Sequence, residues 1–563
     1  MASRNFARWS RRAGIALLAL LAAGTAAAQE SAATRSSAWW SHVTAVAGDD
    51  TEGRMTGSRG YDKAAAYVAD QFKAFGLQPA GARGYLQPVR FKEQQVRADR
   101  SGVALVVGGE AAPVALGAEM LLGARIPQPQ AVEAPLVFIG YGLFMPQARH
   151  DDFAGMDLKG KIAVVINGGP AELPAPMKSS ARSSATWRQL ERAGAVGLVT
   201  IPTPSGMDIP WARQMVLASQ PGMYLADPEL QETGGPRFTA TMNPEAAAKL
   251  FARSGHDFAE VLALAEAGKP VPRFDLNLSL RARVSTQTRN VSSPNIVGVL
   301  PGSDPLLARD YVLVSAHLDH LGVGQPIGGD KVYNGAMDDA SGVATVLEVA
   351  RMMSAAPVRP KRSMLFVVFT AEEKGLLGSR AFAERPSVGK EAVVADLNLD
   401  MFLPLWPLKH LLIQGADESS LGADARAVAA EKGYALIADP YPDRNSFVRT
   451  DQYSFVRAGV PALSLKFGFA PGSPEQQVER DWRANRYHAP SDDLAQPVDL
   501  KAADDFNAYL ADLARRIADQ DQRPAWRPDS VFAPPAPRAQ EGLVTPLEMP
   551  VGRRPQKARP GYG

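Results

Sequence analysis

Residues 311–342 read Tyr311-Val-Leu-Val-Ser-Ala-His317-Leu-Asp319 at their start and Asn334-Gly-Ala-Met-Asp338-Asp339-Ala-Ser-Gly342 at their end. The run 311–316 is short, apolar and rich in strand-favouring residues, which predicts a buried strand. After Asp339, apolar residues recur at helical spacing, which predicts a helix. Open α/β sheets bind their ligands at the carboxyl ends of the strands. We therefore expect His317 and Asp338 to lie side by side at that edge of a sheet.

Histidine and carboxylate side chains of this kind are ligands that zinc accepts in proteins. A surface loop with solvated acidic residues would produce the same short His-x-Asp pattern, so this stretch alone does not establish a metal site. Evidence from the remainder of the chain is needed to distinguish a metal site from a solvated surface loop.

Two further predicted strands, 363–370 and 392–399, also end in acidic residues, Glu372-Glu373 and Asp400. Adjacent carboxylates at a strand end repel each other unless a cation lies nearby. An unpaired charge beside an apolar sheet is costly. A late loop adds Tyr487-His488, and His488 is one of only seven histidines in the whole chain. Together, these strand ends favour a metal site over a solvated loop.

Composition limits the remaining possibilities. With 563 residues and 46% apolar content, the chain is long enough for two to four domains. The formal net charge of +2 gives no sign of a nucleic-acid partner. Cysteine is absent, so a metal has to be held by His, Asp and Glu.

The ends of the chain differ from its middle. Residues 1–28 have a basic start, a short apolar run and a small-residue cleavage site, which is typical of a signal peptide. This predicts an exported protein, periplasmic or secreted, with no stable membrane association after cleavage. Proline-rich residues 524–563 predict a disordered tail. Between them we expect a main domain in two segments, 36–130 and 285–523, interrupted by a β-rich inserted module at 131–284.

Five motifs follow one another as His317-x-Asp319, Gly335-Ala-x-Asp338-Asp339-x-Ser-Gly342, Glu372-Glu373, Leu399-Asp400-Met401 and Tyr487-His488. In this order the chain resembles the co-catalytic di-zinc exopeptidases, over residues 290–500. That family includes leucyl aminopeptidases, glutamate carboxypeptidases and the transferrin receptor ectodomain. The resemblance implies an α/β fold with a mostly parallel central sheet sandwiched by helices, interrupted by a β-rich protease-associated domain. Peptides are the implied substrates.

The resemblance also implies a role for each motif residue, with two zinc ions per chain. His317 and Asp400 would bind one zinc, Glu373 and His488 the other, and Asp338 would bridge both. Glu372 would be the general base that takes a proton from a zinc-activated water. Asp319 would stand behind His317 and fix its tautomer. In this family the peptide bond between Asp338 and Asp339 is cis.

One departure from the family concerns the substrate contacts. Relatives often carry a tyrosine a few residues before Asp451, where this chain has Phe447 and Val448. Arg449 and Tyr487 are our candidates for binding substrate, and Tyr453 is a further candidate for polarising the scissile carbonyl. Arg54, near the start of the mature chain, is expected to be an ordinary solvated side chain.

The charged residues near the site indicate which end of a peptide is cleaved. Arg449 is the one basic residue that the sequence places near the site, whereas a carboxypeptidase would hold the substrate carboxylate with a basic cluster. We therefore expect an aminopeptidase. Arg480, Arg483 and Arg486 could form such a cluster, so a carboxypeptidase or dipeptidase stays open. A single-metal glutaminyl cyclase and an inactive receptor-like protein stay open as well.

Overall fold

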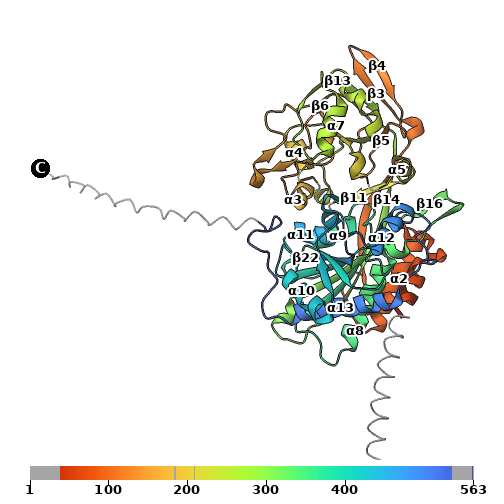
Figure 1. Cartoon of the computed structure of the whole chain (residues 1–563), viewed down its shortest axis with the longest axis vertical. Helices are drawn as coiled ribbons and strands as arrows, with labels where there is room; N and C mark the ends of the chain where they lie inside the picture. Colours follow the sequence, from red (N-terminus) through yellow and green to blue (C-terminus); the bar gives the residue numbers. More distant parts are fainter. Residues whose placement is uncertain (1–37, 183–185, 208, 445, 535–560, 562–563) are drawn as a thin grey trace, which may run out of the picture.

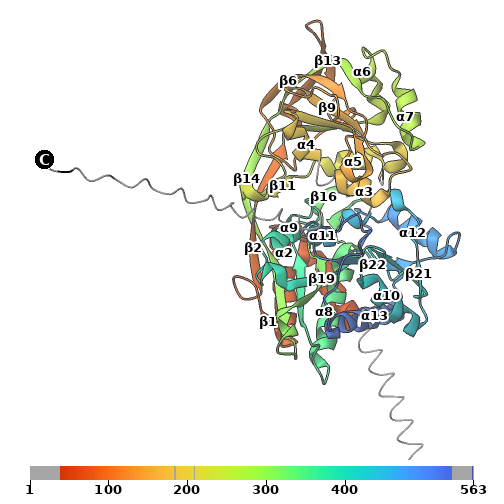
Figure 2. The ribbon, with the colours of Figure 1, turned by 90° about the vertical axis from the view of Figure 1, so that its left-hand side faces the viewer.

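The computed structural model describes residues 38–182, 186–207, 209–444, 446–534 and 561 (Figure 1). The predicted signal peptide, 1–28, lies outside the described residues. Two bodies built on separate sheets lie one above the other in Figures 1 and 2. No helix in the described ranges combines the length and apolarity that crossing a membrane requires.

The lower body contains a ten-stranded sheet within the described residues. Its centre consists of four parallel neighbours, in the order β18 (Ser363–Phe369), β15 (Tyr311–His317), β19 (Val393–Leu399) and β22 (Ala462–Gly468). The outer strands are β20 (His410–Gln414) and β21 (Ala435–Ile437) on one side, and β14 (Thr286–Leu300), β2 (Leu86–Val96), β11 (Gly222–Leu225) and β1 (Gln78–Pro79) on the other.

Most ladders outside this centre are antiparallel. The predicted α/β class is confirmed, but the sheet is mixed rather than mostly parallel. Antiparallel pairing arises because β2 and β14 form one long ladder, from Thr286 with Val96 to Ile296 with Leu86. These two strands lead the chain out to the upper body and back again.

Helices cover both faces of the central sheet, as its alternating side chains require. One face of β15, with Val312 and Val314, packs in the same apolar core as α2 (Arg59–Ala74), α8 (Ser341–Ala355), α10 (Leu421–Lys432) and α13 (Leu500–Asp519). The opposite face, with Leu313, packs with α9 (Leu377–Glu384) and α11 (Gln452–Arg457). Because both faces are buried, the parallel strands read as continuous apolar runs.

The upper body has an eight-stranded sheet of its own. In spatial order its strands are β4 (Glu110–Val114), β3 (Gly102–Val107), β13 (Phe274–Arg283), β6 (Ala131–Phe138), β9 (Ile162–Ile166), β10 (Gly197–Ile201), β12 (Phe238–Met242) and β5 (Met120–Leu122). The sequence boundary at residue 131 was therefore placed too late. Strand β3 pairs with β13, far along the chain, and local patterns do not reveal such a partner.

The remaining elements are short. The upper body holds α3 (Ala175–Ser180), α4 (Thr186–Arg192), α5 (Trp211–Ala218), α6 (Ala248–Phe251), α7 (Phe258–Glu266), β7 (Phe144–Met145) and β8 (His150–Asp151). The lower body adds α12 (Pro474–Asn485), β16 (Gly322–Ile327) and β17 (Asp330–Tyr333).

The start of the predicted disordered tail is ordered, contrary to the sequence prediction. The Trp526 indole donates a hydrogen bond to the Gly459 carbonyl at 2.8 Å. The Phe532 ring packs against Phe447 with centroids 5.3 Å apart. Main-chain hydrogen bonds from Ser420 to Ala525 and from Arg527 to Glu418, each 2.9 Å long, also hold residues 524–534 on the lower body. Apart from residue 561, the rest of the tail lies outside the described residues.

Candidate metal centre

Three strand ends bring predicted site residues together. His317 closes β15, the Glu372-Glu373 pair follows β18, and Asp400 follows β19. Register explains the convergence, because His317 pairs with Phe369 at the end of β18 and Ser315 pairs with Asn398 near the end of β19. Parallel neighbours present their carboxyl ends at the same edge of the sheet. The predicted placement of these residues at that edge is what the structure has.

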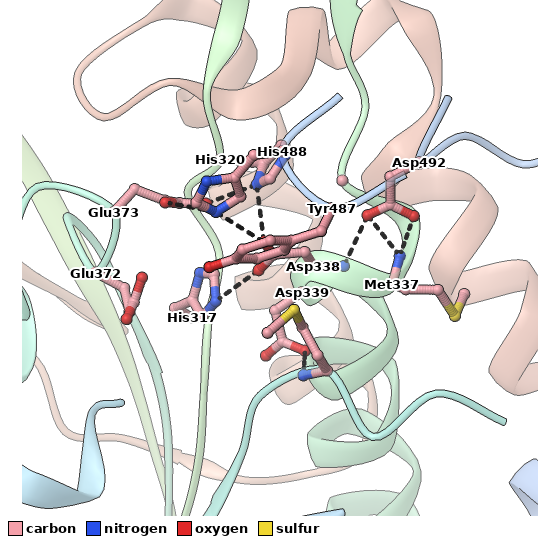
Figure 3. Close-up of polar contacts among 12 residues, drawn as sticks. His317, His320, Met337, Asp338, Asp339, Glu372, Glu373, Tyr487, His488 and Asp492 are labelled. Carbon is pink, nitrogen blue, oxygen red and sulfur yellow. Dashed lines mark hydrogen bonds and ion pairs between the residues drawn. The ribbon is translucent and has the colours of Figure 1, made fainter. Parts of the chain in front are cut away.

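Two groups of side chains offer ligand atoms that all lie within 4.8 Å of one another. The first is His317, Asp338 and Asp400, and the second is His320, Asp338 and Glu373. The His317 Nε2 atom lies 3.3 Å from Asp338 Oδ1, and the His320 Nδ1 atom lies 2.8 Å from Glu373 Oε1. Asp338 belongs to both groups, so its two oxygens face two different sites (Figure 3).

His488 completes the second group from the other side. Its Nε2 atom lies 3.2 Å from Asp338 Oδ2 and 3.4 Å from Glu373 Oε2. The neighbouring Tyr487 ring lies against the imidazole with centroids 3.9 Å apart, as Figure 3 shows. All five predicted metal-ligating residues are therefore gathered around Asp338.

Unsatisfied atoms test whether these residues fit a cation. Among the described residues, several buried atoms of the two groups have no hydrogen-bond partner: His317 Nε2, His320 Nδ1, Asp338 Oδ2, Glu373 Oε1 and Asp400 Oδ1. Buried polar atoms are rarely left in this state. Although His320 and Glu373 approach within 2.8 Å, their atoms are not aligned for a hydrogen bond. Nitrogen and oxygen atoms that crowd together without bonding one another fit zinc, which takes both.

Asp319 acts through different atoms from those expected. The His317 Nδ1 atom is 3.0 Å from the main-chain carbonyl of Asp319 and 4.0 Å from its carboxylate. Because a carbonyl can only accept, Nδ1 carries the proton and Nε2 is left free for a metal. The Asp319 carboxylate instead accepts the amides of Glu372 at 3.0 Å and Glu373 at 3.3 Å. It therefore fixes the turn that carries both glutamates.

The loop around Asp338 is held by two other acidic residues. Asp492, which the sequence did not single out, accepts hydrogen bonds from the amides of Met337 and Asp338 at 3.0 Å each (Figure 3). Asp339 accepts the amide of Met401 at 3.2 Å, next to the candidate ligand Asp400. The peptide bond between Asp338 and Asp339 is cis.

Arg54 is fully buried, so its expected solvated position was wrong. Its guanidinium donates to the carbonyls of Leu318 at 2.7 Å and Gly335 at 3.0 Å, and also to those of Asn334 and Val46. A planar fork with five donors can satisfy several carbonyls at once. Arg54 thus connects the loop after His317 to the loop before Asp338.

The two adjacent glutamates have opposite environments. Burial, reinforced by Asp400 and Glu373, raises the pKa of Glu372 well above its usual value. Burial acts the same way on Glu373, but His488 and His320 outweigh it and lower the pKa of that carboxyl. Glu372 belongs to neither ligand group, and Figure 3 draws no contact from it to a histidine. This asymmetry is typical of an acid–base residue beside a ligand.

The pocket beside the two groups contains both proposed substrate residues, Arg449 and Tyr487. The Tyr453 hydroxyl lies 3.1 Å from Ser180 Oγ of the upper body, so it is engaged away from the ligands. The pocket is also lined by Arg444, Lys466 and Arg483. The sequence argument that Arg449 is the one basic residue near the site was therefore wrong.

His320 is the site residue that sequence reasoning missed. Its signal was present, since it follows Asp319 directly at the end of a predicted strand. The upper body also reaches the site: Arg125 donates to the main-chain carbonyl of Glu373 at 3.0 Å, and Arg213 to that of Tyr487 at 3.3 Å. Both ends of the second ligand group are thereby tied to the inserted body.

Comparisons with known proteins agree with this arrangement. The model of Peptidase family M28 matches residues 295–514. Carboxypeptidase Q of Mus musculus is 30% identical over 196 residues, which is 34% of this chain and 36% of that protein. The probable leucine aminopeptidase 2 of Aspergillus fumigatus is 28% identical over 203 residues, 35% of this chain and 37% of that protein. The chain thus matches little more than a third of the length of these relatives.

The fold extends further than the sequence similarity. The solved structure of an aminopeptidase from Aneurinibacillus sp. strain AM-1 superposes with a TM-score of 0.50 and 20% identity, over 89% of this chain and 96% of that one. The two proteins therefore share their fold across both bodies. The part of this chain that carries the candidate metal centre, residues 295–514, is therefore the part that is similar to peptidase family M28.

Proposed function

We propose that the chain is an exported exopeptidase that uses two zinc ions to release terminal residues from peptides. The observation that carries this proposal is the position of Asp338 in two ligand groups, each with buried atoms that lack hydrogen bonds. A carboxylate is the side chain that can bridge two cations. A catalytically inactive relative would have no need to keep both complete ligand groups and Glu372.

In this proposal His317 and Asp400 hold one ion, Glu373 and His488 hold the other, and Asp338 is shared. His320 is a further candidate ligand of the second site, given its 2.8 Å approach to Glu373. When bound, the zinc pair would supply Lewis acidity that polarises the scissile carbonyl and makes water a better nucleophile near neutral pH.

Glu372 is the proposed general base. It accepts a proton from the attacking water as the water oxygen bonds to the carbonyl carbon, and it returns that proton to the leaving amine. Its amide is fixed by Asp319, and its carboxylate lines the pocket beside the ligands. Arg449 and Tyr487 line the same pocket and are proposed to contact the substrate.

Metal content tests the core of this proposal. Purified mature protein is expected to hold two zinc ions per chain, because two complete ligand groups meet at Asp338. A chelator should abolish peptide hydrolysis, and added zinc should restore it. Elemental analysis of fully active protein that finds one ion per chain would contradict the two-ion arrangement.

For the direction of cleavage we propose an aminopeptidase, because Glu372, Asp338 and Asp400 give the pocket an acidic end that suits a free amine. The matched relatives carry both kinds of name, a leucine aminopeptidase and a carboxypeptidase. A dipeptidase or carboxypeptidase is the second candidate. It is favoured by the basic side chains Arg444, Lys466 and Arg483 in the same pocket.

Blocked peptides separate the aminopeptidase from the carboxypeptidase. Acetylating the N-terminus of a short peptide is expected to stop its hydrolysis, because the amine is then uncharged and larger. The measurement is product release from matched free and acetylated peptides by the zinc-loaded enzyme. Equal rates for the two peptides would favour the carboxypeptidase candidate instead.

A further inference from the structure

The pocket beside the candidate metal centre has walls of different chemistry. Acidic ligands form one end, and aromatic side chains such as Phe402 and Trp406 form another part. Four basic residues also line it: Arg444, Arg449, Lys466 and Arg483. One acidic residue, Glu479, pairs with two of these basic residues. Glu479 accepts a hydrogen bond from Arg483 at 2.7 Å and lies 3.6 Å from Arg444.

Lys466 differs from the arginines. Its side chain is 8% exposed, and in the part of the chain that the structure describes no hydrogen bond or ion pair reaches its ammonium group. The nearby pocket acid Asp439 is already engaged by the Tyr441 amide at 2.8 Å and the Gln414 side chain at 2.5 Å. Lys466 is therefore a buried cation that lines the pocket and forms no ion pair with the described residues.

The strand register puts this cation next to the ligands. Leu465 on β22 pairs with Leu399 on β19, so Lys466 follows Leu465 as Asp400 follows Leu399. Neighbouring strands lie about 4.8 Å apart. Consecutive Cα atoms of a peptide are about 3.8 Å apart, so a group one residue from the scissile bond can reach Lys466.

A buried charge is costly unless it is paired. We propose that Lys466 binds a carboxylate of the substrate within one residue of the scissile bond. That carboxylate is either the C-terminus of a dipeptide or an acidic side chain next to the cleaved bond. The inference rests on the proposed peptidase function and adds the substrate class to it. The competing explanation is that Lys466 merely offsets the negative charge of the metal ligands.

Matched substrates test the proposal with zinc-loaded enzyme. The first pair is leucyl-alanine and its C-terminal amide. The second is leucyl-glutamate amide and leucyl-glutamine amide, and the third is glutamyl-alanine amide and glutaminyl-alanine amide. In one pair, wild type is expected to favour the carboxylate member in kcat/KM by about tenfold to a hundredfold, the range for a hydrogen bond to a charged group. The pair that shows the preference identifies the source of the carboxylate.

Variants assign the preference to this side chain. Lys466→Met should reduce that ratio to near one while hydrolysis of the uncharged member stays close to wild type. Lys466→Arg should retain part of the ratio because it keeps the charge. Lys409→Met is the matched control, since Lys409 is an exposed lysine directly before the neighbouring strand β20. It removes the same charge outside the pocket and should leave the ratio unchanged.

Two results would overturn the proposal. One is a wild-type ratio near one in all three pairs. The other is an equal loss of activity on both members of a pair in Lys466→Met, which is what simple charge compensation predicts.

Calorimetry gives a second readout that does not depend on turnover. It measures the binding of leucyl-alanine, leucyl-glutamate amide and glutamyl-alanine amide, each compared with its uncharged partner. The proteins are zinc-loaded Glu372→Gln and zinc-loaded Glu372→Gln/Lys466→Met. If wild type cleaves no peptide, the peptidase proposal fails, but binding still judges Lys466. Tighter carboxylate binding that Lys466→Met removes supports the site, and equal binding rejects it.

Discussion

Glu372→Gln is expected to lower peptide turnover by about two to four orders of magnitude, the contribution of general base catalysis. The amide keeps the size of the side chain but cannot take a proton from water. The wild-type Glu372 carboxylate makes no ion pair with the described residues and belongs to neither ligand group, so the zinc content of the variant should stay at the wild-type level. Turnover of the zinc-loaded variant and its metal content are the two measurements.

The adjacent residue provides the matched control. Glu373→Gln changes the same chemical group one residue away, but Glu373 lies 2.8 Å from His320 and 3.4 Å from His488. This variant should lose zinc from one site, and excess zinc should partly recover its activity. If Glu372→Gln lost metal and Glu373→Gln kept it, the two assignments would have to be exchanged.

The predictable part of the site is the part that lies at strand ends. Apolar runs such as 311–316 identify buried strands, and parallel strands put whatever follows them at one edge. His317, Glu373 and Asp400 were therefore placed correctly from local patterns. The same reasoning gave the α/β class, since continuous apolar runs are typical of strands covered on both faces.

What local patterns could not give is pairing across long sequence distances. Strand β3 pairs with β13 in the upper body, and β2 with β14, so the start of the insertion and the antiparallel half of the main sheet were missed. Lys466 had a signal, a single lysine inside the apolar strand β22, but only the three-dimensional structure shows that its ammonium forms no ion pair with the described residues. Packing against other segments, rather than composition, likewise ordered Trp526 and Phe532.

Arg54 shows the same limit most clearly. It was expected to be an exposed arginine, because its acceptors belong to loops near residues 318 and 335, far from it in sequence. The turn before Arg54 packs closely against the loop near residue 335. A Cβ atom at Gly53 would lie 2.3 Å from the Tyr333 carbonyl, and Gly53 has a φ of 63°. The segment 49–54 is thus built against the metal-site loops.

Arg54→Met is therefore expected to destabilise the fold by about 3–5 kcal/mol, the typical result of removing one side of a buried charged network. The variant removes the Arg54 donors from the carbonyls of Leu318 and Asn334, and leaves the Gly335 carbonyl with the Ala340 amide alone. Arg54→Lys should recover little, because one ammonium cannot reproduce the planar fork. Zinc affinity should fall by about tenfold to a hundredfold, as for other changes behind metal ligands. Thermal unfolding and competition with a chelator measure the two effects.

Arg362→Met separates loss of zinc affinity from loss of stability. Arg362 is also fully buried, and it donates to Asp310 and to the carbonyls of Ile517, Gln520 and Asp521. It directly precedes β18, at the end of the sheet opposite to Glu372. Because its hydrogen bonds with the described residues go to residues 310 and 517–521 and not to the metal-site loops, its replacement should lower stability by a similar amount and leave zinc affinity unchanged. Equal zinc affinities in Arg54→Met and Arg362→Met would show that Arg54 stabilises the fold without positioning the ligands.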